Sequence, residues 1–140
     1  MTTMLGVSLA GRAVLFVGGG AVAARRLPRL LADGALVTVV APAVSSAVAE
    51  LVASGRVAWT PRRVREDDLD GAWLVHAATG DRHTDAEVTQ WCDARRILCV
   101  NTSDGAHGSA RLTAETRSGD IVVGVASDTG VDPGRAARLR

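Results

Sequence analysis

Three consecutive glycines, Gly18 to Gly20, follow an apolar run and precede a segment with helical spacing. A strand that turns through glycines into a helix N-terminus is an arrangement that binds the pyrophosphate of a dinucleotide. Gly18 would form the tight turn, Gly20 would let the phosphates approach the backbone, and Ala23 would allow close contact between helix and strand. The free N–H groups and the dipole of the helix would then face the negative charge. The alternative is that these glycines only make a tight connection between a strand and a helix.

The end of the second predicted strand lacks a residue that dinucleotide sites usually carry. A carboxylate about twenty residues beyond the glycines normally binds the adenosine ribose. Here the corresponding residues are Ala41, Pro42 and Ala43, so neither a carboxylate nor an arginine for a 2′-phosphate is present. Binding of the ribose is left to the backbone and to Ser45 or Ser46, and no residue at this place selects between NAD and NADP.

A polar group from Asn101 to Gly105 follows a later apolar run and contains Asp104. By themselves these residues favour a polar turn after a strand, in which asparagine and aspartate bind their own backbone. His107 follows three residues after Asp104, but a single histidine without a partner at ligand spacing does not indicate a metal site. We therefore predict no bound metal.

The other histidines and the two cysteines have structural interpretations. His76 lies inside the apolar run 73–78 and is expected in the core, whereas His83 is expected on the surface in a loop. Cys92 and Cys99 have neither the number nor the spacing of a zinc site or a disulfide framework. We expect both to be buried free thiols.

The composition is typical of a single globular domain of 140 residues, 47% hydrophobic and 22% charged. All sixteen basic residues are arginine, which excludes Schiff-base chemistry and the phosphate-loop lysine of nucleoside triphosphatases. A net charge of +1 with few aromatic residues gives no interleaved basic and aromatic surface for nucleic acid. The uncharged run 13–24 is too short to cross a bilayer, and no basic leader precedes an apolar stretch. We therefore expect a soluble, cytoplasmic protein with no nucleic-acid or membrane partner.

Apolar runs alternate with helical patterns along the first hundred residues. Strands are predicted at 13–17, 36–40, 57–59, 73–78 and 97–100, and helices at 21–32, 44–53 and 85–94. This alternation predicts an α/β fold of the Rossmann type, with a parallel sheet and helices on both faces. Pro28 lies inside the first helix and predicts a kink or a local rearrangement. The loops at Gly18, Thr79 and Asn101 each follow a strand, so they should converge at the carboxyl edge of the sheet, where such sheets bind ligands.

After Asn101 the pattern changes. Strand-like segments at 111–116 and 121–127 flank a polar turn and predict an antiparallel hairpin. Asp132 and Pro133 are typical of an N-cap and a first helical residue, but the chain stops about two turns later. We therefore predict an NAD-binding domain over residues 1–108, followed over residues 109–140 by the hairpin and a truncated helix.

Several separated segments together resemble a known family. They are residues 14–23 with 30–42, residues 68–79, residues 96–104, and the end group Gly130, Pro133, Ala136, Leu139 and Arg140. In this order, and over nearly all of its length, the chain is similar to the dehydrogenase and chelatase module of siroheme synthase, the precorrin-2 dehydrogenase/sirohydrochlorin ferrochelatase family. The missing ribose carboxylate is part of the similarity. The family continues past position 140 into dimerising helices, so the resemblance implies a homodimer in the full-length form.

The resemblance implies NAD-dependent dehydrogenation of precorrin-2 to sirohydrochlorin, with ferrous iron as the substrate of a second, ferrochelatase activity. Asp104 matches the family's acid/base aspartate. This role suits the chemistry, because hydride removal is accompanied by proton loss and metal insertion needs deprotonated pyrrole nitrogens. The expected cofactor contacts come from the family positions and, for the last residue, from the convergence of the loops: Gly18, Gly20, Ala21, Val22, Ala41, Pro42 and Thr79.

The chain departs from the family pattern near the expected substrate side. Ala110 and Thr113 stand where an aromatic residue and a proline are common, and Asp128 and Thr129 stand in a turn that usually has small residues. Asp85 replaces an asparagine. These changes bear on substrate fit and chelation more than on cofactor binding. Several arginines are candidates to offset the substrate's carboxylates, although isolated arginines are more often only solvated: Arg111, Arg117, Arg135 and Arg138.

Two other functions remain open at this stage. One is a non-catalytic, NAD-sensing regulatory domain, in which the same fold changes the shape of an oligomer, although such sensors usually keep the ribose carboxylate. The other is a family member that binds NAD but does not turn over without the helices that follow position 140.

Overall fold

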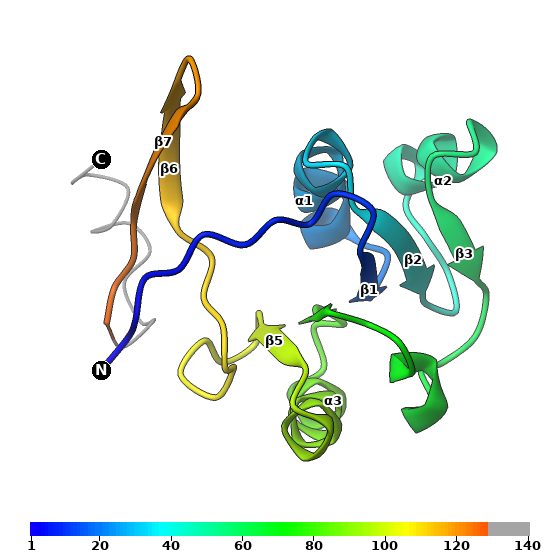
Figure 1. The fold of residues 1–140 in the computed structure, drawn as a ribbon. Helices are drawn as coiled ribbons and strands as arrows, with labels where there is room; N and C mark the ends of the chain where they lie inside the picture. Colours follow the sequence, from blue (N-terminus) through cyan, green and yellow to red (C-terminus); the bar gives the residue numbers. More distant parts are fainter. Residues whose placement is uncertain (129–140) are drawn as a thin grey trace.

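The computed structural model describes residues 1–128 and contains the α/β sheet predicted from the sequence (Figure 1). Its parallel strands are β1 (Ala13–Val17), β2 (Leu36–Val40), β3 (Ala58–Thr60), β4 (Leu74–Ala77) and β5 (Leu98–Asn101). The helices are α1 (Ala21–Ala32), α2 (Ser46–Ala53) and α3 (Arg82–Arg95), with a short 3₁₀ helix, η1 (Glu66–Leu69). The strand order is β3-β2-β1-β4-β5. The order of addition therefore reverses between β1 and β4, which is the point where open α/β sheets bind ligands.

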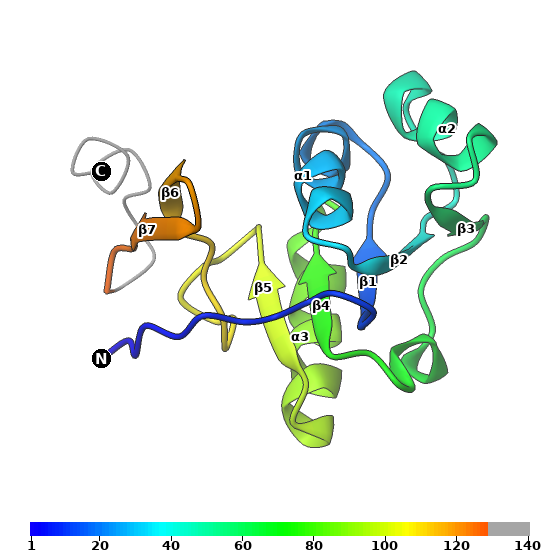
Figure 2. The ribbon, with the colours of Figure 1, turned by 45° about the horizontal axis from the view of Figure 1, so that its top comes forward.

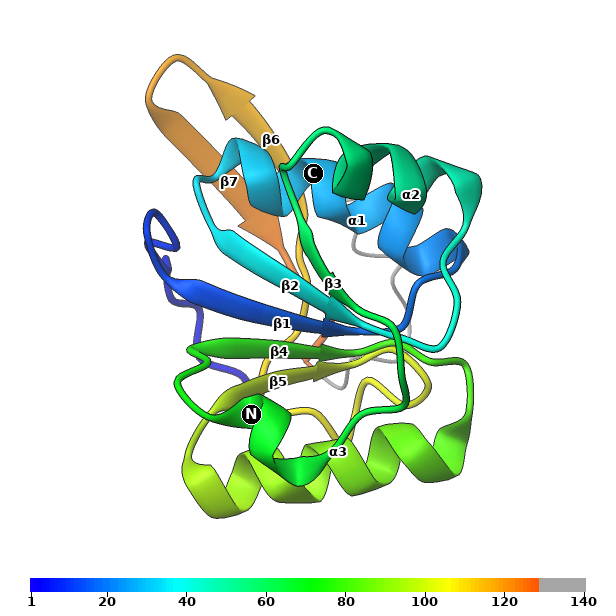
Figure 3. The same ribbon diagram turned by 90° about the vertical axis from the view of Figure 1, so that its right-hand side faces the viewer.

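Helices cover both faces of this sheet, as predicted, with α1 and α2 on one face and α3 on the other (Figure 3). Alternate residues of β1 are buried on opposite sides, because successive side chains of a strand point to opposite faces. Val14 and Phe16 pack in the same cluster as Leu27 of α1, whereas Leu15 and Val17 pack in the cluster that includes α3. These two apolar layers hold the start of α1 and the start of α3 at the same edge of the sheet.

The first helix, α1, continues through Pro28 to Ala32. The local rearrangement predicted at Pro28 does not end the helix, because Leu27 and Leu30 on either side of it are buried in the core. Gly34, with a φ of +83°, follows the end of the helix in a left-handed conformation that favours glycine.

The third helix, α3, begins at Arg82, three residues before the predicted start at Asp85. The reason is the N-cap Asp81, whose carboxylate accepts hydrogen bonds from the N–H groups of His83 (2.9 Å) and Thr84 (3.4 Å). These two bonds hold the pKa of Asp81 below its usual range, and the bond from His83 has the larger effect. The extra turn buries Asp85 instead of leaving it at the helix end.

The predicted antiparallel hairpin is formed by β6 (Ala114–Ser118) and β7 (Ile121–Val125), and it stands beside the parallel sheet (Figure 2). Its two-residue turn contains Gly119, whose φ of +60° suits glycine. β6 begins and ends later than the predicted 111–116, and β7 ends before the predicted residue 127, because the paired residues run from Ala114 with Val125 to Ser118 with Ile121. The helix predicted from Asp132 lies outside the described residues.

Polar contacts join this hairpin to the rest of the molecule. Arg29 of α1 forms an ion pair with Glu115, and Arg117 forms one with Asp33 at 3.3 Å. Thr2 donates hydrogen bonds to Asp128, so the N-terminal segment lies against the end of the hairpin (Figure 1). Within residues 1–128, the helices are too short or too polar to serve as a bilayer-crossing segment.

Candidate functional site

A cavity of about 520 Å³ lies at the carboxyl edge of the sheet, between the glycine loop, the end of β2 and the start of α3. Five of the residues predicted to contact a cofactor line it together: Gly18, Gly20, Ala41, Pro42 and Thr79. Ala21 and Val22 are not among its lining residues, because they belong to the first turn of α1 behind the loop. The structure thus brings together loops that follow three different strands.

Each glycine of the loop has a different environment. Gly18 has a φ of +125°, and a Cβ on it would lie 2.1 Å from the carbonyl oxygen of Ala78. A Cβ on Gly19 would lie 2.7 Å from the carbonyl oxygen of Ala43. A Cβ on Gly20 would meet no described atom within 4 Å. Packing therefore requires the first two glycines, whereas Gly20 leaves space on the open side of the loop.

The start of α1 suits an anionic group. Its N-cap is Gly20, which provides no side-chain hydrogen bond, and its first turn contains no acidic residue. By contrast, Ser45 caps α2 and Asp81 caps α3 with their side chains. The first N–H groups of a helix need acceptors, and a diphosphate supplies them. The residues present therefore fit the pyrophosphate of a dinucleotide.

The end of β2 forms an apolar wall, and the charged residues of the cavity come from elsewhere. Ser45 does not face the cavity as a free hydroxyl, because its Oγ accepts from the N–H of Val48. Arg63, Asp81 and Glu87 also line the cavity. Local sequence patterns did not indicate these three residues, since Arg63 lies in an irregular loop and α3 begins three residues before the predicted Asp85.

A buried carboxylate joins the loops after β4 and β5. Asp85 has no exposed surface, and its Oδ1 accepts from the N–H (3.0 Å) and the hydroxyl (2.7 Å) of Thr79. The hydroxyl of Ser103 donates to its other oxygen. Thr89 and Asn101 extend the network behind it, with 3.0 Å between Asn101 Nδ2 and Thr89 Oγ1. Asp85, noted in the sequence only as a departure from the family, therefore fixes a cofactor-side loop to the loop that carries Asp104.

Asp104 lies in a turn at the surface, and its side chain is 38% exposed. Its N–H donates to Asn101 Oδ1 at 2.9 Å, and its Oδ1 accepts from the N–H of Ala106 at 3.2 Å. Its Oδ2 lies 3.1 Å from Nδ1 of His107. Asp104 therefore makes the polar turn that the residues alone favoured and also presents a carboxylate next to an imidazole. It does not line the cofactor cavity.

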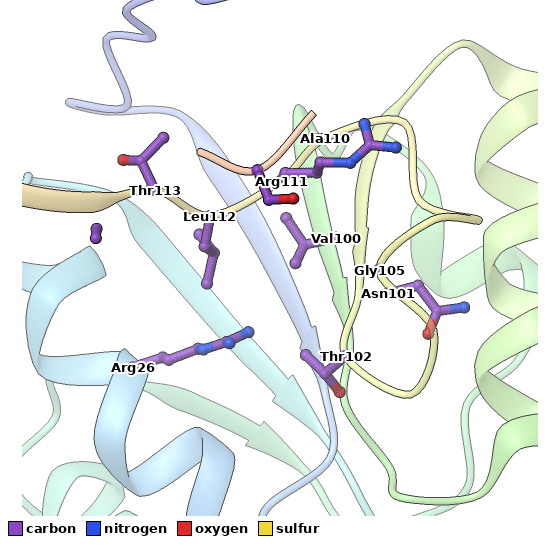
Figure 4. Close-up of a pocket in the computed structure, with 11 residues that line it drawn as sticks. Arg26, Val100, Asn101, Thr102, Gly105, Ala110, Arg111, Leu112 and Thr113 are labelled. Atoms are coloured by element: carbon purple, nitrogen blue, oxygen red, sulfur yellow. The ribbon is translucent and has the colours of Figure 1, made fainter. Parts of the chain in front are cut away.

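A second cavity, of about 400 Å³, lies between α1, the end of β5 and the segment that leads into β6. Figure 4 shows Arg26 extending from α1 toward Thr102, with Arg111 on the opposite wall. Thr102 donates a hydrogen bond to the carbonyl oxygen of Ala77 at 3.0 Å. This contact ties the second cavity to the end of β4.

His76 lies in the core, as predicted, and is 1% exposed. Its ring stacks on Phe16 with 4.9 Å between the ring centres. No group of residues 1–128 hydrogen-bonds either ring nitrogen. Burial, and secondarily the charge of Arg26, lower the pKa of His76 to about 4. His76 is therefore neutral near pH 7.

The prediction for the two cysteines is confirmed, since Cys92 and Cys99 are buried free thiols. His83 is exposed as predicted, but it lies in the first turn of α3 and not in a loop.

Within the described part of the chain, no group of three or more His, Cys, Asp or Glu residues is arranged to hold a metal ion.

Comparisons with known proteins agree with this geometry. Residues 5–114 match the family model described as "Putative NAD(P)-binding". The chain is 32% identical to a precorrin-2 dehydrogenase of Priestia megaterium over 139 residues, which cover 99% of this chain and 67% of that protein. It is 38% identical to a siroheme synthase of Photorhabdus laumondii over 121 residues, which cover 86% of this chain and 26% of that protein.

A solved structure named SirC, precorrin-2 dehydrogenase, is similar to the whole chain. The TM-score is 0.81 and the sequence identity 31%, over 99% of this chain and 67% of that one. The chain thus spans about two thirds of the dehydrogenase and about a quarter of the siroheme synthase that it matches.

Proposed function

Because this chain belongs to the family of NAD(P)-binding modules of precorrin-2 dehydrogenases and siroheme synthases, we propose that it catalyses the NAD-dependent dehydrogenation of precorrin-2 to sirohydrochlorin. Ferrous iron insertion into the product would be a second activity of the same site, and the full-length form would be a cytoplasmic homodimer. The observation that carries the proposal is the cavity where the glycine loop, the uncapped start of α1 and Thr79 meet.

The cofactor would be held mainly by backbone groups. The first N–H groups of α1 would bind the diphosphate, and the open side of Gly20 would let it approach. Ala41 and Pro42 would contact the adenosine half. When bound, the nicotinamide accepts a hydride from the substrate.

The cavity wall carries charges of both signs, which bear on the choice between NAD and NADP. Asp81 and Glu87 line it, and the lowered pKa of Asp81 keeps that carboxylate ionised. Two carboxylates disfavour the additional 2′-phosphate of NADP. Arg63 is the cation that would favour it, so the variant Arg63→Gln is the matched test of cofactor choice.

Asp104 would act as the general base of the reaction. As the C–H bond breaks, its electron pair leaves with the hydride, and the oxidised macrocycle also loses a proton. The partly exposed carboxylate beside His107 would accept that proton and release it to solvent. The same carboxylate would take protons from the pyrrole nitrogens during iron insertion.

The test is an anaerobic assay with precorrin-2 and NAD, in which NADH formation and the sirohydrochlorin spectrum are followed together. We expect Asp104→Asn to lower turnover by about 10²- to 10⁴-fold, the usual effect of losing a general base. Asp120→Asn, in the hairpin turn outside both cavities, is the control and should retain turnover. Iron insertion is measured in the same samples after adding ferrous iron.

Two results would count against the proposal. Equal turnover of wild-type protein and Asp104→Asn would remove the role of Asp104. NAD binding without any turnover would instead favour a sensing domain or a module that needs the rest of its protein.

A further inference from the structure

The second cavity has the electrostatic character of an anion site. Its walls carry two arginines, Arg26 and Arg111, and two threonines, Thr102 and Thr113. No carboxylate is among its described lining residues. The hydroxyl of Thr102 donates to Ala77 and that of Thr113 to Glu115, so the two guanidinium groups give the cavity its positive character.

Both arginines have buried donor atoms without an acceptor. Arg26 Nη1 and Arg111 Nε are inaccessible to solvent, and no acceptor within residues 1–128 binds them. Burial, followed by the charge of Arg25, lowers the pKa of Arg26. Buried polar groups in native proteins are nearly always hydrogen-bonded. A guanidinium held in this state indicates a missing anionic acceptor.

The neighbouring acidic side chains are engaged elsewhere. Asp85 accepts from Thr79 and Ser103, and Asp33 pairs with Arg117. Asp128 is held by Thr2, and Arg111 contributes only a minor part of the lowering of its pKa. The neutral His76 provides no negative charge either.

We propose that this cavity is a carboxylate-binding subsite, in which Arg26 and Arg111 hold a carboxylate side chain of the tetrapyrrole substrate. The inference rests on the proposed function and extends it by naming the residues that bind the edge of the macrocycle. A planar guanidinium matches a carboxylate with two parallel hydrogen bonds. The cofactor's diphosphate does not need this site, because the start of α1 and the glycine loop of the other cavity fit it.

The position of the cavity suits this role. Thr102 and Gly105, on either side of Asp104 in sequence, both line it. A carboxylate bound by Arg26 would therefore anchor the macrocycle next to the loop that carries the proposed base. From the sequence, Arg111 was a candidate to offset the substrate's carboxylates, whereas Arg26 was not, because it is far from the hairpin along the chain.

The test measures binding and stability separately for Arg26→Met, Arg111→Gln and the double variant. Arg26→Lys retains the charge, and Arg56→Gln, exposed after α2, is the matched control. The binding probe is uroporphyrin, a fluorescent porphyrin with eight carboxylates, titrated into the 140-residue chain. NAD affinity, the KM for precorrin-2 and the thermal midpoint without ligand are measured on the same variants.

We expect Arg26→Met and Arg111→Gln each to lower the affinity for uroporphyrin by about 10-fold, which is the usual effect of losing a charge-assisted hydrogen bond. The affinity for NAD should be unchanged. Arg26→Lys should recover part of the affinity. Without ligand, Arg26→Met should have an equal or higher thermal midpoint, because it removes a half-buried guanidinium whose Nη1 has no acceptor within residues 1–128. A purely structural role for Arg26 predicts a lower midpoint.

The outcomes separate this inference from the proposed function. Weaker porphyrin binding in the variants supports the subsite even when the chain has no turnover. Turnover with unchanged KM and unchanged porphyrin affinity overturns it. Loss of NAD affinity in place of porphyrin affinity also overturns it, because the cavity would then hold part of the cofactor. No porphyrin binding by the wild-type chain, with no turnover, overturns both.

Discussion

At the scale of single residues, Gly18 and Gly20 are chemically identical but have different constraints. A Cβ at Gly18 would collide with the backbone of the neighbouring strand's loop, at a φ that favours glycine, whereas a Cβ at Gly20 would enter open space. The first glycine is therefore a requirement of the fold. The second glycine is not required by the packing, and it leaves space for a ligand to approach the loop.

Alanine substitutions should separate these two roles. We expect Gly18→Ala to lower the free energy of unfolding by about 2 kcal/mol or more, through the clash and the strained backbone. Gly20→Ala should leave the thermal midpoint nearly unchanged and lower the affinity for NAD. Thermal denaturation and NAD titration of both variants measure this, and an unstable Gly20→Ala with normal NAD affinity would contradict the assignment.

His76 should make stability depend on pH below neutrality. Its pKa is lowered to about 4 in the folded chain, so the unfolded chain binds the proton more readily. Stability is fully present above the ordinary histidine pKa of about 6.5 and is lost as the pH falls toward 4. The loss from this residue would be at most about 3 kcal/mol.

Urea denaturation at several pH values between 7 and 4 tests this expectation. His76→Leu should have a flatter dependence than the wild-type chain, because it cannot bind the proton in the unfolded state. His83→Leu is the matched control, since His83 is exposed, and its curve should follow the wild type. An equal slope for His76→Leu would show that His76 is not the source.

At the scale of elements, α3 does more than cover one face of the sheet. Its N-cap Asp81 lines the cofactor cavity, and Asp85, one turn later, receives hydrogen bonds from Thr79 and Ser103. The helix therefore sets the loops after β4 and β5 relative to each other. The cofactor side and the Asp104 side of the site share this support.

Removing the Asp85 carboxylate should disturb both loops. Asp85→Ala leaves buried donors without an acceptor, so we expect a loss of about 2–4 kcal/mol in the free energy of unfolding and weaker NAD binding. Asp85→Asn keeps one acceptor oxygen and should be less affected. Asp93→Ala, exposed on the same helix, is the control. Urea unfolding and NAD titration measure the effect, and an Asp85→Ala chain as stable as the control would refute it.

At the scale of the whole molecule, two cavities share the carboxyl edge of one sheet. The cofactor cavity is bounded by the glycine loop and α3, and the second cavity by α1, β5 and the segment before the hairpin. Asp104 belongs to the loop between β5 and that segment and lines neither cavity. The hairpin is held to α1 by ion pairs, which position the wall that carries Arg111.

The sequence by itself determined the elements and their class, because these depend on local patterns. Continuous apolar runs alternate with helical segments, which implies a parallel sheet, and the glycines after the first strand marked the phosphate loop. Local patterns also predicted the hairpin and the burial of His76. They failed at the start of α3, where the capping bonds to Asp81 begin the helix three residues before the predicted Asp85.

The tertiary structure alone decided which distant residues meet. Asp85 joins Thr79 to Ser103, and Arg26 of α1 lines the same cavity as Arg111. No periodicity links such pairs, since their contact follows from the strand order and from how the helices pack on the sheet. The chemical type of each side chain follows from the sequence, but the residues that it contacts depend on how the sheet and helices pack.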